Sequence, residues 1–347
     1  MSENLSKRKN FIVIGLGSMG TRRVKHCLEQ KYDVTGYDLR YDRTQRAKDE
    51  LEIQVVENFL EIENLVQLNR VNGVFIDTPP AEHFRYIQYC IDNHINFFVE
   101  QPAVHTRTSL ELCKNIVADR EVCVDLRPFV MQVSTNLRFS KIVKKLRELF
   151  ESDNVSQPLY AFVECAEYLP DWHPYEPYTD YYPSNKNMGG GLDVICDVDW
   201  LNYLFGNFQL KNKVELKKSS LKIDTPDIMQ YTFTFEGSRY NGLLVTIYED
   251  LLQRTPIHTA KFITENEVIY ADFINNNITI DNGKLREIKI INIKEDNFST
   301  LSSNNKKWNW VEESYYLESL EFFNKIDKQD TSLTSFKNEL YKLSQIL

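Results

Sequence analysis

A glycine-rich turn near the N-terminus constrains the fold of this chain more than any other feature. Residues 15–20 read Gly-Leu-Gly-Ser-Met-Gly, directly after the apolar run 11–14 and directly before a helical segment, 21–31. In such a turn the first glycine permits a tight bend, the second admits a diphosphate close to the backbone, and the third lets helix and strand pack closely. The predicted diphosphate-binding residues are Gly15, Gly17, Ser18, Met19 and Gly20.

An acidic residue follows at the distance that this kind of unit requires. Asp38 stands at the end of a second predicted strand, 32–37, roughly twenty residues after the glycines. A carboxylate there holds both ribose hydroxyls and repels a 2′-phosphate, so the sequence predicts NAD rather than NADP. Arg40, two residues further on, offsets that repulsion or is a solvated loop cation, and it keeps NADP as the alternative cofactor.

Strands and helices then alternate through the first third of the chain. Further strands are predicted at 73–77, 95–100 and 122–125, with helices at 83–94 and 109–119. This alternation is typical of a parallel sheet with helices on both faces. We therefore predict a Rossmann-type dinucleotide-binding domain over residues 1–125.

The pattern changes after residue 126, where strands begin to follow one another directly. This succession is typical of an open, largely antiparallel sheet, so residues 126–347 are predicted to form an α+β substrate and oligomerisation domain. The fold class of the whole chain is α/β. The predicted elements are helices at 140–150, 192–205, 312–326 and 334–347, a strand at 158–166, a series of strands from 213 to about 293, and a polar loop at 297–307.

Composition excludes several classes of partner. The 347 residues carry a net charge of -9, which disfavours nonspecific binding to nucleic acid or to an anionic membrane. No apolar run reaches the roughly 18 residues of a membrane span, and the N-terminus has no apolar signal core. The six cysteines include no Cys-x-x-Cys pair. We expect reduced thiols, no metal site and a cytoplasmic location.

Short motifs in a fixed order resemble the Gfo/Idh/MocA family, named for glucose-fructose oxidoreductase and inositol dehydrogenase. They are the glycine turn, Asp-Thr-Pro-Pro at 77–80, Glu-Gln-Pro at 100–102, Asn-Leu-Arg-Phe at 136–139, and the triple glycine 189–191 followed by Asp193 and Asp199. The resemblance implies hydride transfer between a sugar carbon and nicotinamide. It also implies a dimer contact through the second sheet, so we expect a homo-oligomer, a dimer or a tetramer.

The resemblance and the strand-end positions also extend the predicted cofactor site. His83 begins the helix after the third strand, where packing or capping near the cofactor is favoured over chemistry. The additional predicted cofactor contacts are Asp38, Arg40, Thr78, Pro79, His83, Glu100 and Gln101.

Two of the three catalytic side chains that the resemblance implies are replaced in this chain. Gln101 stands where the family has a lysine, and Cys196 stands where it has a histidine, while Asp193 matches the supporting aspartate. Glutamine cannot titrate, and cysteine is a poor general base unless its pKa is shifted. Asp193, Cys196 and Asp197 share one face of the predicted helix, so Asp197 is either a substitute base or a solvated carboxylate.

The loop before the triple glycine resembles one branch of the family. Its Trp-His-Pro sequence, within residues 169–176, is similar to enzymes encoded beside surface-sugar pathways, including those of sialic-acid-like sugars. His173 is a candidate substrate contact or a packed loop residue. Lys186 is either a replacement cation or a surface lysine. The loop tyrosines, which bind sugar or close the loop, are Tyr175, Tyr178, Tyr181 and Tyr182.

Two classes of function remain open from the sequence. The first is an NAD(P)-dependent oxidoreductase acting on a hydroxyl or ketone of a sugar, a nucleotide-sugar or a sugar acid. The second is a non-catalytic sensor or scaffold of the same fold, since an intact cofactor site with replaced catalytic residues suits binding without turnover. A structural protein that binds no dinucleotide is a third interpretation, which Gly17 and Asp38 disfavour.

Overall fold

The computed structural model describes residues 8–68, 70–122, 128–152, 154–173, 176–236, 239–294 and 309–347. The chain forms two compact units, the first made of Met1–Ser134 and Tyr316–Tyr341, the second of Thr135–Tyr315 and Lys342–Leu347. The predicted boundary at 125/126 lies close to the first crossing. The sequence did not indicate that the chain returns to the first unit near its C-terminus.

The first unit contains a parallel sheet in the order β3-β2-β1-β4-β5-β6, six strands within the described residues. The strand order reverses beside β1, the switch point at which ligands bind in sheets of this kind. The strands are β1 (Asn10–Ile14), β2 (Asp33–Tyr37), β3 (Gln54–Val55), β4 (Gly73–Ile76), β5 (Phe97–Val99) and β6 (Met131–Val133). The helices between them are α1 (Ser18–Glu29), α2 (Tyr41–Leu51), α3 (Phe59–Gln67), α4 (Pro80–Asp92) and α5 (Arg107–Val122).

Some of these elements differ from the sequence prediction. The polar segment after Asp38 was not predicted to be helical, although it forms α2. The strand predicted at 122–125 is wrong at its first residue, because Val122 ends helix α5, and the rest of it lies outside the described residues. The last strand of the sheet is β6 instead. Both segments are short apolar runs, which periodicity alone does not distinguish.

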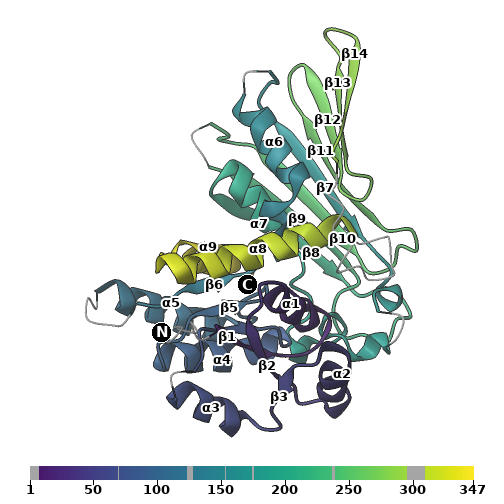
Figure 1. Ribbon diagram of the computed structural model, residues 1–347. Helices are drawn as coiled ribbons and strands as arrows, with labels where there is room; N and C mark the ends of the chain where they lie inside the picture. Colours follow the sequence, from purple (N-terminus) through teal and green to yellow (C-terminus); the bar gives the residue numbers. More distant parts are fainter. Residues whose placement is uncertain are drawn as a thin grey trace. The chain divides into compact units, whose positions relative to one another are not determined.

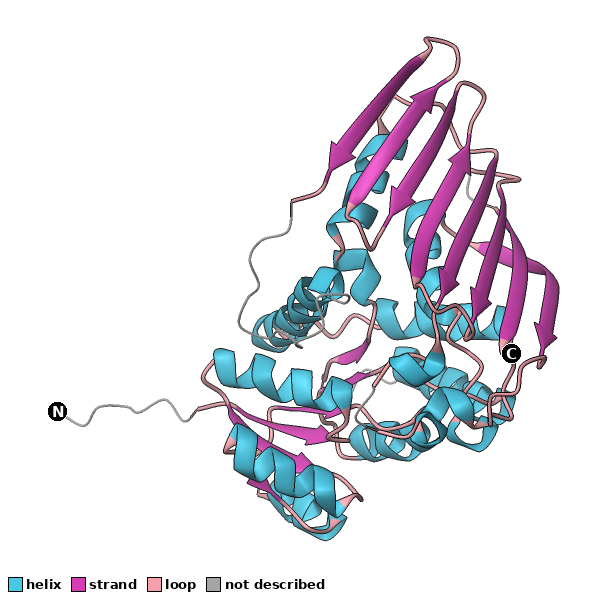
Figure 2. Ribbon diagram, turned by 90° about the vertical axis from the view of Figure 1, so that its right-hand side faces the viewer, coloured by secondary structure: helices cyan, strands magenta, loops and turns pink. Residues whose placement is uncertain are grey.

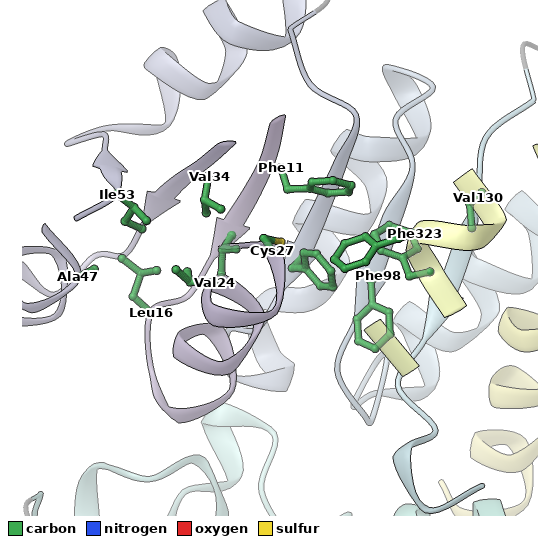
Figure 3. Close-up of a cluster of buried hydrophobic side chains, with 13 residues drawn as sticks. Phe11, Leu16, Val24, Cys27, Val34, Ala47, Ile53, Phe98, Val130 and Phe323 are labelled. Atoms are coloured by element: carbon green, nitrogen blue, oxygen red, sulfur yellow. The ribbon is translucent and has the colours of Figure 1, made fainter. Parts of the chain in front are cut away.

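Aromatic packing explains why the C-terminal part of the chain belongs to the first unit. Helix α8 (Asn309–Lys328) carries Phe322 and Phe323, which contact Phe11 of β1 and Phe75 of β4. These rings lie in one buried cluster, shown in Figure 3. Burying a phenylalanine stabilises a protein by about 1.5–3 kcal/mol, so this aromatic cluster fixes the helix on the sheet.

The second unit contains a larger sheet in the order β14-β13-β12-β11-β7-β10-β9-β8, eight strands within the described residues. Its pairings are antiparallel except between β7 and β10, which run parallel. The strands are β7 (Tyr160–Ala166), β8 (Phe208–Leu216), β9 (Ile228–Phe235), β10 (Leu244–Asp250), β11 (Ile257–Ile263), β12 (Glu267–Asp272), β13 (Asn277–Asn282) and β14 (Glu287–Asn292). The predicted fold class, a parallel-sheet domain followed by an open, largely antiparallel sheet, is confirmed.

Helices cover one face of this second sheet, as Figures 1 and 2 show. Helix α6 (Lys141–Glu151) and helix α7 (Ile195–Phe205) pack through Phe150 and Phe205 on Phe262 of β11. Alternate residues of the strands point to this face, as the burial of every second residue of β9 illustrates. The short helical turns are η1 (Asn136–Phe139), η2 (Leu169–Asp171), η3 (Tyr178–Asp180), η4 (Tyr182–Ser184) and η5 (Lys186–Met188), and α9 (Thr334–Ile346) ends the chain.

Candidate functional sites

The glycine turn has the close packing that its sequence predicts. Gly15 has a φ of +93°, and a Cβ atom on it would lie 2.5 Å from the carbonyl oxygen of Asp77. A Cβ atom on Gly20 would lie 1.7 Å from the carbonyl oxygen of Gly15. Helix α1 begins at Ser18, and no side chain caps its N-terminus. The amide groups of its first turn are therefore suited to bind an anion such as a diphosphate.

Asp38 is held in place at the end of β2. Its Oδ2 accepts a hydrogen bond from the Leu16 amide at 2.7 Å, and its Oδ1 accepts one from the Arg40 amide at 2.8 Å. The guanidinium of Arg40 is paired with Asp42 at 2.6 Å. This pairing favours the role of Arg40 as a loop cation over that of a partner for a 2′-phosphate.

Arg43 lies beside the predicted cofactor site, and the sequence analysis missed it because the helix that carries it was not predicted. Its Nη1 lies 3.7 Å from Asp38 Oδ2 and 3.3 Å from the position of a Cβ atom on Gly17. The guanidinium therefore lies beside both the glycine turn and the Asp38 carboxylate. Together with the close-packed glycines, these groups fit a bound NAD.

Thr78, Pro79 and His83 follow the carboxyl end of β4. The Thr78 hydroxyl is buried without a hydrogen-bond partner among the described residues. The two ring nitrogens of His83 lie 2.7 Å from the carbonyl oxygen of Thr78 and 2.9 Å from that of Pro102. Since both nitrogens are occupied by backbone groups, the contacts support a structural role for His83.

The side chains of Glu100 and Gln101 each contact a helix, Glu100 contacting α1 and Gln101 contacting α9. Glu100 accepts a hydrogen bond from Arg23 Nη2 at 2.5 Å. The Gln101 amide donates to Glu339 Oε2 of α9 at 2.8 Å, and the Ala103 amide donates to Glu339 Oε1 at 3.2 Å. Gln101 is thus positioned by a buried carboxylate.

Arg23 centres a buried charge network that the sequence analysis also missed. Its guanidinium contacts Glu100 and Glu318, each at 2.5 Å, and lies 3.9 Å from Asp77. Arg23 and Glu318 are both fully buried. Burial and the nearby Glu100 hold the pKa of Asp77 well above its usual value, against the opposing effect of Arg23. Nothing in the local sequence of α1 indicates that this arginine points inward.

In the second unit, Asp193 is paired with a tyrosine of the loop that precedes the triple glycine. Tyr182 Oη donates a hydrogen bond to Asp193 Oδ1 at 2.7 Å. Burial raises the pKa of Asp193, and the hydrogen bond from Tyr182 partly offsets that rise. Asp193 precedes helix α7, which begins at Ile195, so the predicted helix starts three residues too early. The pair combines a carboxyl whose pKa is raised with a hydroxyl that donates a hydrogen bond to it. This arrangement suits proton transfer.

Cys196 and Asp197 lie in the first turn of α7. Burial, followed by the nearby Asp193 and Asp197, raises the pKa of the Cys196 thiol well above its usual value. Asp197 is only 2% exposed, so the interpretation of a solvated carboxylate is wrong. Its Oδ1 accepts hydrogen bonds from Trp200 Nε1 at 2.6 Å and pairs with His258 Nε2 at 2.9 Å.

His258 is a third residue that the sequence analysis missed. It lies on β11 directly opposite Cys165 of β7, on the face covered by helices. The alternation of β11 gives the only sequence signal for its inward position, since His258, Ala260 and Phe262 are two residues apart.

The aromatic side chains of the loop before the triple glycine contact mainly other residues of that loop. The His173 ring packs edge-on against Tyr181 at 5.0 Å between centroids, and Tyr181 Oη donates to the His173 carbonyl oxygen. Tyr178 Oη accepts from the Lys222 amide at 3.1 Å, and the side chain of Lys186 is exposed. These contacts favour packing roles for His173 and Tyr181. Tyr175 lies outside the described residues.

The Asn-Leu-Arg-Phe motif contributes Arg138 to a buried network of ion pairs. Arg138 donates two hydrogen bonds to the Asp199 carboxylate, at 2.7 and 2.6 Å, and the fully buried Lys342 also pairs with it. Burial alone raises the pKa of Asp199, but Lys342 and Arg138 outweigh burial and hold it below its usual value.

We expect the Asp199 carboxylate to stabilise the fold at neutral pH and to lose that contribution in acid. Because its pKa is lower in the folded state, the stabilisation is complete above the unfolded value of about 3.9 and is lost as the pH falls below it. At pH 7, Asp199→Asn costs about 1.5–3 kcal/mol, the usual value of a hydrogen bond to a charged group. Urea unfolding over a pH series checks this.

The difference between wild type and Asp199→Asn should therefore shrink as the pH falls below about 4. The control is Asp281→Asn, which changes an exposed carboxylate on β13 and should leave the free energy of unfolding nearly unchanged. A difference that stays constant down to acidic pH would contradict the assignment.

Comparisons with known proteins agree with this geometry. Residues 9–126 match the family model GFO_IDH_MocA, described as the oxidoreductase family with an NAD-binding Rossmann fold. The chain therefore carries an NAD-binding oxidoreductase domain. The family resemblance drawn from the sequence, to Gfo/Idh/MocA proteins, is confirmed over this segment. A comparison with curated proteins finds no match.

Solved structures share the fold of the whole chain at low sequence identity. UDP-N-acetylglucosamine 3-dehydrogenase GnnA from Acidithiobacillus ferrooxidans is 15% identical with a TM-score of 0.72, covering 97% of this chain and 95% of that one. Levoglucosan dehydrogenase in complex with NADH and L-sorbose is 15% identical with a TM-score of 0.77, covering 98% and 95%. An oxidoreductase from Agrobacterium radiobacter, in complex with NAD+, L-tartaric acid and magnesium, is 13% identical with a TM-score of 0.76, covering 98% and 94%.

Among the described residues, no helix is both long and apolar enough to cross a membrane.

Proposed function

We propose that this protein is an NAD-dependent oxidoreductase that transfers hydride between nicotinamide and a hydroxyl or ketone of a sugar, nucleotide-sugar or sugar acid. The observation that carries the proposal is the half-buried Asp193 carboxyl with its hydrogen bond from Tyr182. It supplies a group able to take a proton, which the replaced lysine and histidine positions lack. The NAD-binding family and the dehydrogenases of the same fold support the class of reaction.

In this mechanism, the glycine turn and Asp38 would hold NAD, which would supply the hydride acceptor for oxidation and the hydride donor for reduction. Asp193 takes the hydroxyl proton during oxidation and returns it during reduction. A general base works best when its pKa lies near the working pH, and burial moves the pKa of Asp193 upward from its ordinary acidic value. Tyr182 orients the carboxyl and stabilises its charged form.

The other predicted catalytic residues take supporting roles in this proposal. Gln101, held by Glu339, positions the substrate hydroxyl without exchanging a proton. Cys196 remains a thiol, because its pKa is raised by burial and by its acidic neighbours. Asp197 is engaged by Trp200 and His258, so we do not assign it the role of base.

The test is a comparison of Asp193→Asn with wild type in NAD reduction. The substrate panel should contain UDP-N-acetylglucosamine, levoglucosan and sugar acids of the sialic-acid kind. We expect kcat to fall by about 10²–10⁴, the usual contribution of a general base, while the dissociation constant of NADH stays unchanged. Unchanged turnover in Asp193→Asn would show that another group takes the proton.

The pair also predicts the direction of a pH shift. Tyr182→Phe removes the hydrogen bond that lowers the pKa of Asp193, so the acid limb of the kcat profile for oxidation should move to higher pH. Tyr178→Phe is the matched control, since the Tyr178 hydroxyl accepts a hydrogen bond from the Lys222 amide and not from a group of Asp193. It should leave the profile in place.

Asp38 should decide the choice between the two nicotinamide cofactors. Replacing it in Asp38→Ser removes the carboxylate that holds the ribose and repels a 2′-phosphate, so the NADH dissociation constant should rise by about 10–100-fold while NADPH binding improves. Fluorescence titration of both cofactors measures this. Glu50→Gln changes an exposed carboxylate near the other end of α2 and should have no such effect. An unchanged preference in Asp38→Ser would overturn the assignment, and NADP would then be the alternative cofactor.

A binding-only function is the second candidate, because the positions of the family's lysine and histidine hold an amide and a protonated thiol. A sensor of this kind binds NADH without transferring hydride to any sugar. We further propose that the protein is a homo-oligomer, since the edge strand β14 exposes Ile288 and Ile290. We also propose a cytoplasmic location, where the free thiols of the described cysteines stay reduced.

A further inference from the structure

A group of metal-binding side chains lies on the inner face of the second sheet, where β7, β11 and helix α7 meet. The Cys165 thiol, the Asp197 carboxylate and the His258 ring each offer a ligand atom, and these atoms all lie within 4.8 Å of one another. Cys165 and His258 face each other across neighbouring strands. The sequence analysis predicted no metal site, because the three residues come from three distant segments and show no ligand spacing.

A buried carboxyl beside this group would be stabilised by a bound cation. Glu249 lies in register with Cys165 on the neighbouring strand β10, so its side chain points to the same face. Glu249 is only 6% exposed, and its Oε2 is buried without a hydrogen-bond partner in the part of the chain that the structure describes. Burial of such an unpaired carboxyl is costly unless a counter-charge or a hydrogen bond reaches it.

No lysine or arginine among the described residues forms an ion pair with the carboxyls of this group. Glu249 lies opposite Cys165 on one neighbouring strand, and His258 lies opposite Cys165 on the other. Among the described residues, Asp197 accepts a hydrogen bond from the Trp200 indole and pairs with the His258 ring. A divalent cation bound here would compensate the Asp197 carboxylate and a Cys165 thiolate at once.

From these observations we propose that Cys165, Asp197 and His258 bind one zinc ion, with the carboxylate of Glu249, on the strand beside Cys165, as the candidate fourth ligand. Thiolate, imidazole and carboxylate are the ligands that zinc prefers, and a soft thiolate disfavours magnesium or calcium. The His258 nitrogen and the Asp197 oxygen are 2.9 Å apart. Two such ligands of a tetrahedral zinc are separated by roughly 3.4 Å, so only a small adjustment is needed.

The surroundings also resemble those of an ordered metal site. Trp200 donates to Asp197, and the His258 ring stacks on Phe273 at 4.4 Å between centroids. Contacts of this kind orient ligands before the metal binds. On binding, the Cys165 sulfur would lose its proton to solvent and bond to the metal as a thiolate. This proposal does not depend on the proposed oxidoreductase activity, and its test measures binding alone.

The experiment uses the untagged full-length protein, stripped with a chelator and titrated with zinc by calorimetry and with cobalt by absorbance. We expect one ion per chain, a rise in melting temperature with zinc, and a thiolate-to-cobalt charge-transfer band. Cys165→Ser should abolish the band and weaken zinc binding by at least about 10–100-fold, and His258→Gln should weaken binding similarly. Cys90→Ser, a buried cysteine of α4 in the first unit, is the control and should keep both signals.

A second variant protects the test against misfolding of Cys165→Ser. Glu249→Gln is nearly isosteric and removes an unpaired buried carboxyl, so the metal-free protein should be at least as stable as wild type while zinc affinity falls. The absence of zinc binding by wild type would overturn the proposal. Binding of equal strength in wild type, Cys165→Ser and His258→Gln would also overturn it, because the ion would then be adventitious.

Discussion

We expect Arg23→Met to lower the free energy of unfolding by about 3–5 kcal/mol, the usual cost of removing one partner from a buried ion pair. The substitution keeps most of the side-chain volume, so the loss comes from charge rather than from a cavity. It leaves Glu100 and Glu318 without the guanidinium that each contacts at 2.5 Å. Denaturant unfolding at neutral pH measures the effect.

Two variants separate this effect from the loss of a surface charge. Arg23→Lys keeps the charge but cannot contact two carboxylates as a planar fork, so its loss should be intermediate. Lys25→Ala removes a lysine of the same helix that forms no ion pair with any described residue, and it should change stability by no more than about 0.5 kcal/mol. If Arg23→Met lost as little as Lys25→Ala, the network would not stabilise the fold.

Gly20→Ala should abolish measurable NADH binding, with a dissociation constant raised at least about 100-fold. A methyl group there would lie 1.7 Å from the carbonyl oxygen of Gly15, which is backbone and cannot rotate away. The first turn of α1 must then move relative to β1, and the diphosphate site is lost with it. Calorimetric titration with NADH measures the change.

Ser18→Ala is the matched control for this prediction. Ser18 is the first residue of α1, and its hydroxyl accepts from Arg22 at 2.5 Å, so the substitution leaves the close packing of the glycine turn intact. NADH affinity should then stay within about tenfold of wild type. Normal binding by Gly20→Ala would mean that the dinucleotide does not use this turn.

The close-packed glycine turn and the place of Asp38 at the end of a strand could be predicted from the sequence, because they depend on neighbouring residues. Gly15, Gly20 and Asp38 lie in one βαβ unit, where a tight turn, a strand end and a helix start can be recognised from neighbouring residues. Arg43 was missed for the opposite reason. Its helix begins in a polar segment with little apolar periodicity, so its place beside Asp38 depends on packing that sequence spacing does not show.

The buried charges were much harder to predict. Arg23 contacts Glu318, 295 residues further along the chain, and Asp199 pairs with Lys342, 143 residues further along. Nothing in the local sequence distinguishes these residues from solvated charges. The same limit applies to His258, which lies opposite Cys165 through strand pairing and contacts Asp197 of helix α7. Such contacts follow from the fold and not from motif spacing.

Transfer of deuterium from NADH deuterated at nicotinamide C4 tests the central claim most directly. The protein is incubated with this cofactor and with pools of keto-sugars, nucleotide-sugars and sugar acids, and the products are analysed by mass spectrometry. The account predicts deuterium on a carbon of a sugar product, in an amount that Asp193→Asn reduces sharply. Deuterium that stays on the bound cofactor with every pool would contradict the enzymatic account and support a sensor.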